Sequence, residues 1–191
     1  GHWDYLYAAR DLIELPGNRF HKKKNLYNQF VKSYNYTYID FGPKLIEQAM
    51  AMQEDWCTWR ECSSDIELAH ENEAIARVLS DWDGLFGVTG GSILVDGRVA
   101  AYTVGERLTP DMMVIHFEKG SADFKGVYQA INQMFLEHQA AGISWVNREQ
   151  DIGDEGLRKA KLSYHPVRFL KKSEQEDHFD TKTNFSPFSI R

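Results

Sequence analysis

Cysteine, proline and long hydrophobic runs are all scarce in this sequence. The 191 residues include only 2 cysteines and 5 prolines. No apolar stretch approaches the roughly 20 residues that a membrane-spanning helix needs. The scarcity excludes a disulfide framework, and no secretory signal is visible at the N-terminus. Cys57 and Cys62 lie five apart in a predicted helix, so we expect reduced thiols on different helix faces, in a cytoplasmic protein.

What remains is the composition of an ordinary globular protein. Hydrophobic residues make up 42% of the chain, aromatic residues 13% and charged residues 26%, which argues against wholesale disorder. The length suits about one to one and a half domains. We expect Gly1-His2 to be a tag remnant, residues 3–172 to form one domain, and residues 173–191 to be a polar extension.

Charge is distributed very unevenly along the chain, although the net charge is only -6. Residues 47–83 hold ten acids against two bases, whereas residues 18–32 hold five bases and residues 156–172 hold six bases, with no acid in either. If the two basic stretches share a face, that face attracts a polyanion. Each stretch is equally well explained as the solvated surface of a helix.

Hydrophobic periodicity predicts a mixed sequence of helices and strands. An amphipathic helix at 19–33, a strand at 36–40 and helices at 44–60 and 65–82 come first. Asp96-Gly97 then joins two apolar runs, the strongest short signal for a β-hairpin. The remaining elements are strands at 112–118, 143–147 and 166–170, and helices beginning at 127 and covering 154–163. The predicted class is α+β, or a mixed α/β sheet.

The first chemically interesting segment runs from the strand that contains His116 and Glu118 to the helix that follows Lys125-Gly126. A helix N-terminus with a preceding glycine holds anions well, although an ordinary strand-to-helix turn looks the same. Alternation places His116 and Glu118 on the same face of the strand. Glu118 beside a histidine could act as a general base, or it could simply be a carboxylate in an ion pair. Gln129 and Asn132 share one face of the helix, in a polar pocket or at a solvated edge.

A second segment begins where the strand at 143–147 ends. Asn147, Arg148, Glu149 and Asp151 follow one another there, and the end of a strand is the usual place for a site in an open sheet. In the next helix Arg158 and Lys161 are three residues apart and can bind one phosphate or carboxylate together. Nothing in the chain has the spacing of a zinc site or of a convincing catalytic triad.

The order of elements looks like the GNAT acyltransferase fold, with one additional helix in front at 19–33. Five segments also resemble the C-terminal-type domain of phosphatidylglycerol lysyltransferases. They are HKKKN at 21–25, HFEKG at 116–120, KGVYQAIN at 125–132, NREQDIG at 147–153 and GLRKAKLSYHP at 156–166. That family is GNAT-like and is related to the Fem transferases, which use aminoacyl-tRNA. Many members have two tandem GNAT-like halves, and this chain resembles the second half.

The resemblance implies transfer of an acyl or aminoacyl group to an amine or hydroxyl, without a covalent enzyme intermediate. It assigns the roles of base to Glu118 or Glu149, and of acid or orienting donor to Tyr164. Lys125, Gly126, Val127 and Tyr128 would bind the donor, and Gln129, Asn132 and Asn147 would position the substrate. The polyanion-binding residues would be Lys22, Lys23, Lys24, Arg148, Arg158 and Lys161.

The family also implies which ligands and partners to expect. The donor would be an acyl-CoA or an aminoacyl-tRNA, with no tightly bound cofactor and no metal, and an upstream GNAT-like half would be a partner. The site requires that two neighbouring strands part near His116 and Trp145. The competing hypothesis is a non-catalytic GNAT-like module that binds a nucleic acid, a nucleotide or a partner domain.

Overall fold

The hairpin expected at Asp96-Gly97 lies in the middle of a large sheet. In the computed structural model, which describes residues 3–171, Asp96 has φ 49° and Gly97 has φ 80°. Two consecutive left-handed residues are what a type I′ turn requires, and glycine adopts that conformation without strain. The strands on either side, β3 (Val88–Val95) and β4 (Arg98–Thr109), pair antiparallel as predicted.

Seven strands form one sheet in the order β2-β3-β4-β5-β6-β1-β7. The other five strands are β1 (Trp3–Ala8), β2 (Tyr36–Asp40), β5 (Met112–Gly120), β6 (Trp145–Asn147) and β7 (Arg168–Lys171). Among the strands within residues 3–171, only β5 and β6 pair parallel, and the connection between them is a helix, which makes a βαβ crossover. The predicted meander followed by a crossover is therefore confirmed.

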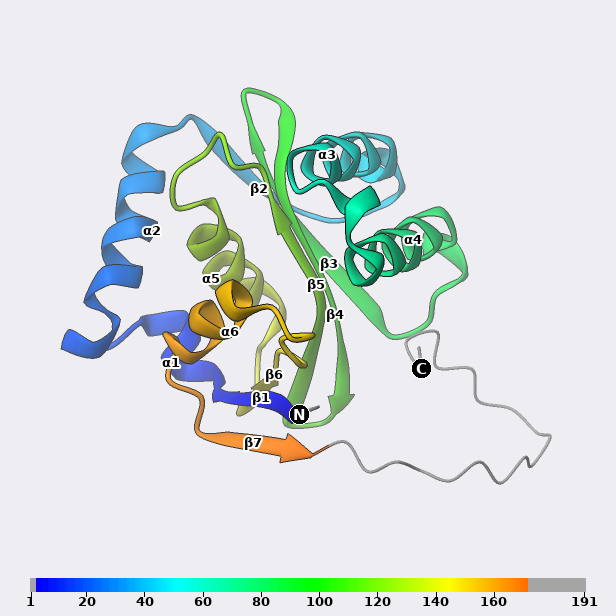
Figure 1. The fold of residues 1–191 in the computed structure, drawn as a ribbon. Helices are drawn as coiled ribbons and strands as arrows, with labels where there is room; N and C mark the ends of the chain where they lie inside the picture. The colour runs from blue at the N-terminus through cyan, green and yellow to red at the C-terminus, as the bar shows by residue number, and fades with distance from the viewer. Residues whose placement is uncertain (1–2, 172–191) are drawn as a thin grey trace, which may run out of the picture.

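Helices cover both faces of the sheet (Figure 1). They are α1 (Ala9–Glu14), α2 (His21–Ser33), α3 (Ile46–Trp59), α4 (Ile66–Ser80), α5 (Val127–Gln139) and α6 (Glu155–Leu162). The pair α3 and α4 lies on one face, and the remaining helices lie on the other. All seven helices and strands that the sequence predicted between 19 and 118 are present, with ends shifted by a few residues.

The core consists of three apolar clusters, one under each group of helices. Under α3 and α4, Tyr102 and Val104 pack with the helix side chains. Phe30 of α2 joins side chains of α5 and β3 in a second cluster. The third cluster brings Tyr7 of β1 together with Phe135 of α5. Because α2 contributes a fully buried phenylalanine, the additional helix is an integral part of the domain.

The first strand and helix were missed by the sequence prediction. Strand β1 lies between β6 and β7, and its residues 4–7 are all buried. Side chains buried on both faces do not alternate, so the period-2 pattern that reveals a half-exposed strand is absent. This strand matters for function because it brings Tyr5 and Tyr7 beside the end of β6.

The expectation of two reduced thiols on different helix faces is wrong, because Cys57 and Cys62 form a disulfide. The predicted helix does not continue through both residues. Helix α3 ends at Trp59, Glu61 adopts a left-handed φ of 53°, and Cys62 lies in a separate short turn. Once the helix has ended, the chain folds back and the two Cα atoms come within 5.1 Å.

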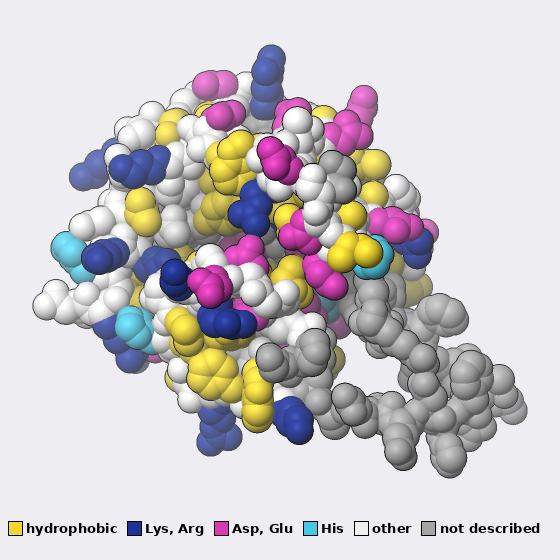
Figure 2. Space-filling view, viewed as in Figure 1, with side chains coloured by type: hydrophobic (Ala, Val, Ile, Leu, Met, Phe, Trp, Pro, Cys, Tyr) yellow, Lys and Arg dark blue, Asp and Glu magenta, His cyan; other side chains and the backbone are white. Residues whose placement is uncertain are grey.

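The uneven charge of the sequence becomes an uneven surface (Figure 2). Lys and Arg side chains gather on the side where α2 lies, and Asp and Glu side chains gather over α3 and α4. Among the described residues, no helix is long and apolar enough to cross a bilayer. The predicted tag remnant and the predicted extension at 173–191 lie outside the residues that the structure describes.

Candidate active site

Strands β5 and β6 separate in the middle of the sheet. Their parallel ladder joins Met112 to Trp145 and ends with the pair Val114 and Asn147. Strand β5 continues to Gly120 without a β6 partner along that edge. The predicted parting is confirmed at His116, but Trp145 belongs to the paired region. A gap between two parallel strands, at their carboxyl ends, is where an open sheet places a ligand.

Glu118 of β5 and Arg148, which follows β6, meet across this gap. The Nη2 atom of Arg148 donates to Oε1 of Glu118 at 2.8 Å, and Nδ2 of Asn132 donates to the other carboxylate oxygen at 3.1 Å. The side chains of Glu118 and Arg148 are only 9% and 13% exposed. Three residues that the sequence singled out separately therefore form one buried polar cluster, which occupies the gap.

Two tyrosine rings enclose the guanidinium of Arg148. Its central carbon lies 5.9 Å from the ring centre of Tyr7 and 5.1 Å from that of Tyr164. Burial raises the pKa of Tyr164 to about 12, although Arg148 lowers it in part. A hydrogen bond with Gln129 of α5 lowers that pKa as well. The hydroxyl of Tyr164 is therefore protonated at neutral pH, beside a buried cation.

Lys161 of α6 holds the loop that carries Arg148. Its ammonium donates to the main-chain carbonyls of Arg148, Glu149 and Gln150, at 2.5, 3.2 and 2.8 Å. The hydroxyl of Tyr7 in turn donates to the carbonyl of Lys161 at 2.9 Å. All three ammonium protons are used, so Lys161 positions a loop, whereas the sequence suggested that it binds a polyanion.

The other predicted groups after β6 also bond within the fold. Nδ2 of Asn147 donates to Asp4 at 2.9 Å, and its Oδ1 accepts from the amide of Glu149 at 2.7 Å. Arg158 makes two hydrogen bonds to Asp151, at 2.6 and 3.1 Å. Hydrogen bonds from Arg158 first, and from Tyr5, hold the pKa of Asp151 well below its usual range.

The backbone of Glu149 belongs to this network, but its carboxylate does not, and this side chain is 30% exposed. Its Oε1 lies 3.3 Å from Nδ1 of His116, and Nε2 of that imidazole lies 3.3 Å from Glu106. The backbone of Glu149 has a left-handed φ of 52°, which is uncommon for a residue other than glycine. The carboxylate lies on the β5 side of the gap, beside His116.

The turn before α5 is covered by the additional helix. Gly126 has φ 85°, and a Cβ atom there would lie 2.2 Å from the carbonyl oxygen of Leu26 in α2. The amide of Lys125 donates to the hydroxyl of Tyr34 at 3.1 Å, and Val127 is buried. Part of the predicted anion-binding turn is thus engaged by α2. Glycine is required at 126 both by its conformation and by this close approach.

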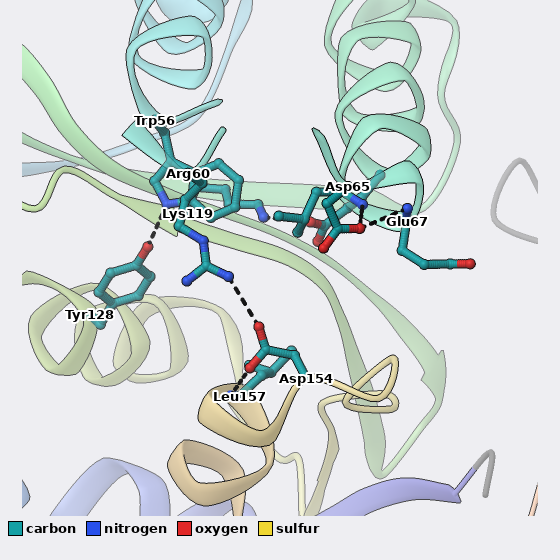
Figure 3. Close-up of polar contacts among 10 residues, drawn as sticks. Trp56, Arg60, Asp65, Glu67, Lys119, Tyr128, Asp154 and Leu157 are labelled. Atoms are coloured by element: carbon teal, nitrogen blue, oxygen red, sulfur yellow. Dashed lines mark hydrogen bonds and ion pairs between the residues drawn. The ribbon is translucent and has the colours of Figure 1, made fainter. Parts of the chain in front are cut away.

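Tyr128, the last of the predicted donor-binding residues, faces α3 (Figure 3). Its hydroxyl accepts from Nε1 of Trp56 at 3.1 Å, and the ammonium of Lys119 lies 3.8 Å from the centre of the Trp56 ring. Arg60, one turn further along, donates to Asp154 at 3.0 Å. Beside this bridge a hollow of about 230 Å³ lies between the first turn of α4 and residues 152–154.

The lysines of α2 divide into two kinds. Lys22 and Lys24 are exposed, whereas Lys23 is half-buried and its ammonium lies 4.3 Å from the centre of the Tyr164 ring. The structure therefore gathers Lys23, Glu118, Asn132, Arg148, Tyr164 and Gln129 around the gap. Sequence reasoning missed Tyr7 and Trp56, and the period-3.6 stripe of α3 was the only signal for Trp56.

Known proteins share this fold. A family model described as phosphatidylglycerol lysyltransferase, C-terminal, matches residues 1–173. A conserved protein of unknown function from Bacteroides thetaiotaomicron is 35% identical, with a TM-score of 0.83 over 88% of this chain and 57% of that one. The C-terminal domain of a protein described as a lysylphosphatidylglycerol synthetase, from Agrobacterium fabrum, is 15% identical. Its TM-score is 0.61, over 88% of this chain and 57% of that one.

A curated relative matches a similar share of this chain and of its own length. An uncharacterized protein of Mycoplasmoides gallisepticum is 23% identical over 175 residues, which are 88% of this chain and 54% of that protein. The chain thus spans little more than half the length of these relatives. The predicted mixed α/β fold is confirmed. The chain belongs to the phosphatidylglycerol lysyltransferase C-terminal family.

Proposed function

We propose that this chain transfers an acyl or aminoacyl group from an activated donor to an amine or a hydroxyl. The donor is an acyl-CoA thioester or an aminoacyl-tRNA ester. The observation that carries the proposal is the parting of β5 and β6 beside the Glu118–Arg148 pair and Tyr164. At this point the fold has a gap between strands, a buried ion pair and a protonated hydroxyl, which together could stabilise a reacting carbonyl. The chain also belongs to a transferase-related family.

The proposed reaction is a direct transfer between two bound substrates. The acceptor nitrogen or oxygen attacks the donor carbonyl carbon, a new C–N or C–O bond forms, and the C–O or C–S bond to the leaving group breaks. A base takes the proton of the acceptor and an acid returns one to the leaving group. The fold contributes mainly by holding the two substrates in line for attack.

Glu149 is the better placed of the two candidate bases. Both carboxylate oxygens of Glu118 already accept hydrogen bonds, from Arg148 and Asn132. Glu149 is more exposed, and its carboxylate reaches the imidazole of His116. We therefore assign proton abstraction to Glu149, and assign to Glu118 the orientation of Arg148 near the donor carbonyl.

Tyr164 suits the role of acid. Burial keeps its pKa near 12, so the phenol carries its proton throughout the neutral range. The α5 N-terminus is proposed to bind the donor end through the exposed side chain of Lys125, because Gly126, Val127 and the Tyr128 hydroxyl are engaged within the fold. Gln129 and Asn132 are proposed to align the substrates, since both amide atoms of Asn147 already bond within the fold. Such donors are made in the cytoplasm, which is the compartment that we propose for the protein.

A transfer assay with labelled donors tests the proposal. The chain is incubated with acetyl-CoA or with a mixture of aminoacyl-tRNAs and a panel of amine and hydroxyl acceptors. We expect transfer from one donor class, and losses of about 100-fold in Glu149→Gln and Tyr164→Phe, the usual size of a general acid or base effect. Full activity in both variants would remove the catalytic assignments.

One observation favours a second candidate function, a non-catalytic module that binds a nucleic acid, a nucleotide or a partner domain. Glu118 and Arg148 fill the gap with their own side chains, and Lys161 and Arg158 bond within the fold. Binding of tRNA that weakens steeply with salt, with no transfer from any donor, would support this function over catalysis.

A further inference from the structure

One lysine of the additional helix faces the candidate site, and its neighbours in the sequence do not. The ammonium of Lys23 lies 4.3 Å from the centre of the Tyr164 ring. Successive helix residues are turned by about 100°, so Lys22 and Lys24 point elsewhere, and both are exposed. The three lysines of the HKKKN segment are therefore not equivalent.

Two cations and one carboxylate, Lys23, Arg148 and Glu118, meet around the Tyr164 ring. Arg148 lies 5.1 Å from the same ring, and its partner Glu118 is shared between Arg148 and Asn132. Between residues 3 and 171, no carboxylate lies within ion-pair distance of Lys23. Burial first, and then the charge of Arg148, lowers the pKa of Lys23 to about 8, although the charge of Glu118 opposes this in part. A half-buried cation in this position is stabilised when a ligand brings the missing negative charge.

Other groups at this point also donate hydrogen bonds. The hydroxyl of Tyr164 is protonated, and its oxygen already interacts with Gln129. The guanidinium of Arg148 lies 5.1 Å from the centre of the same ring and stays paired with Glu118, so its charge acts on Lys23 without leaving the pair. An ammonium, a phenol and a nearby guanidinium match a group with several acceptor oxygens.

We infer that Lys23, with the charge of Arg148 near the same Tyr164 ring, forms a binding site for a single anionic group of the ligand, a phosphate or a carboxylate. The inference deepens the proposed function and rests on it for the location of the site. It differs from the polyanion surface expected of the whole lysine segment, because one inward-facing ammonium binds one group. The additional helix α2 then contributes directly to ligand recognition.

Titration calorimetry with simple anions tests the inference. Inorganic phosphate and acetate are titrated separately into the chain at constant ionic strength, to distinguish the two kinds of anionic group. For the anion that binds, we expect Lys23→Met to weaken binding by about tenfold or more, the effect of losing one charge-assisted hydrogen bond. The matched control, Lys22→Met with Lys24→Met, removes two charges from the same helix and should change the dissociation constant less than about twofold.

Three results would overturn the inference. They are the absence of binding of both anions to the wild type, equal weakening in Lys23→Met and the double control, and full binding in Lys23→Met. Lys23→Gln, checked by circular dichroism, gives a second variant if Lys23→Met fails to fold. A single-stranded RNA oligomer whose binding depends equally on all three lysines would show a polyanion surface instead.

The outcome is separable from that of the proposed function. Selective loss of phosphate or acetate binding in Lys23→Met, without transfer activity from any donor, supports the anion site and removes the transferase proposal. If instead Glu149→Gln lowers transfer activity and Lys23→Met has no selective effect on anion binding, the transferase proposal is supported and the anion site is removed.

Discussion

Arg148 and Glu118 join two strands at the point where those strands no longer pair. Their side chains meet at 2.8 Å, with Arg148 directly after the last rung of the ladder between β5 and β6 and Glu118 four residues past that rung on β5. Where the main-chain hydrogen bonds between β5 and β6 have ended, this charge-assisted hydrogen bond connects the two segments. Both side chains are largely buried. Because a buried charge without its partner is costly, the ion pair should be as important for stability as for the proposed chemistry.

We predict that Glu118→Gln lowers the free energy of unfolding by about 3–5 kcal/mol, because it leaves the Arg148 guanidinium buried without a counter-charge. Urea denaturation followed by circular dichroism measures the change. The double variant with Arg148→Met should be more stable than Glu118→Gln alone, since it removes both charges. A double variant that loses the sum of the two single losses would contradict this account of the pair.

The glycine before α5 gives a second prediction. Gly126→Ala places a Cβ atom 2.2 Å from the carbonyl oxygen of Leu26, in addition to the strain of φ 85°. Gly142→Ala is the matched control, because Gly142 has φ 76° and open space around it. Both variants should lose about 1 kcal/mol through backbone strain, and Gly126→Ala about 1–3 kcal/mol more through the clash.

The comparison is made by urea denaturation of both variants and the wild type. Equal losses in the two variants would mean that α2 moves away from Gly126 at no cost. The helix would then not be packed against the turn as the structure has it.

The contact between Glu118 and Arg148 shows how much of the site can be predicted from the sequence alone. The strand that carries Glu118 and the helix that carries Asn132 follow from periodicity, because each has one apolar and one polar face. The meeting of Glu118 with Arg148 does not follow, since the two lie 30 residues apart and their distance depends on where a strand ladder ends. The family resemblance placed both residues at one site without giving the contact.

Other parts of the site were beyond sequence reasoning for local reasons. Strand β1 has no alternation, so neither it nor Tyr7 was predicted. Lys23 could not be told from Lys22 and Lys24, because only the packing of α2 decides which of three adjacent lysines turns inward. The pairing of Cys57 with Cys62 depended on the exact end of α3, and helix ends are poorly determined by sequence.

Lys23 leads to a prediction on pH dependence. Its pKa is lowered from 10.5 to about 8 by burial and by Arg148, with Glu118 opposing and Tyr164 facing the ammonium. Between these two values the folded protein binds fewer protons than the unfolded chain, so this residue makes stability rise as pH increases from about 8 to 10.5. The rise should disappear in Lys23→Met.

Unfolding free energies measured across that range for both proteins give the difference that belongs to Lys23. A difference that does not vary between pH 8 and 10.5 would show that the ammonium is as well hydrated in the fold as in the unfolded chain. Lys22→Met serves as the control, because that lysine is exposed and should leave the pH profile unchanged.

Lys161 gives the prediction that links stability to activity. Its ammonium donates to the carbonyls of three consecutive residues, beginning with Arg148, so Lys161→Met leaves that loop without its donor. We expect the free energy of unfolding to fall by about 2 kcal/mol or more. The transfer rate should fall by a larger factor than binding of the donor, because Arg148 and Glu149 shift relative to the gap while the α5 N-terminus stays in place.

Lys159→Met is the matched control, since Lys159 lies on the same short helix and is exposed. Steady-state kinetics separate the two effects: a fall in kcat with little change in KM is the signature of misplaced reacting groups. If Lys161→Met raises KM for a phosphate-bearing donor and leaves kcat unchanged, then Lys161 binds the donor directly. The polyanion role suggested by the sequence would then be preferred over the positioning role that its three carbonyl contacts support.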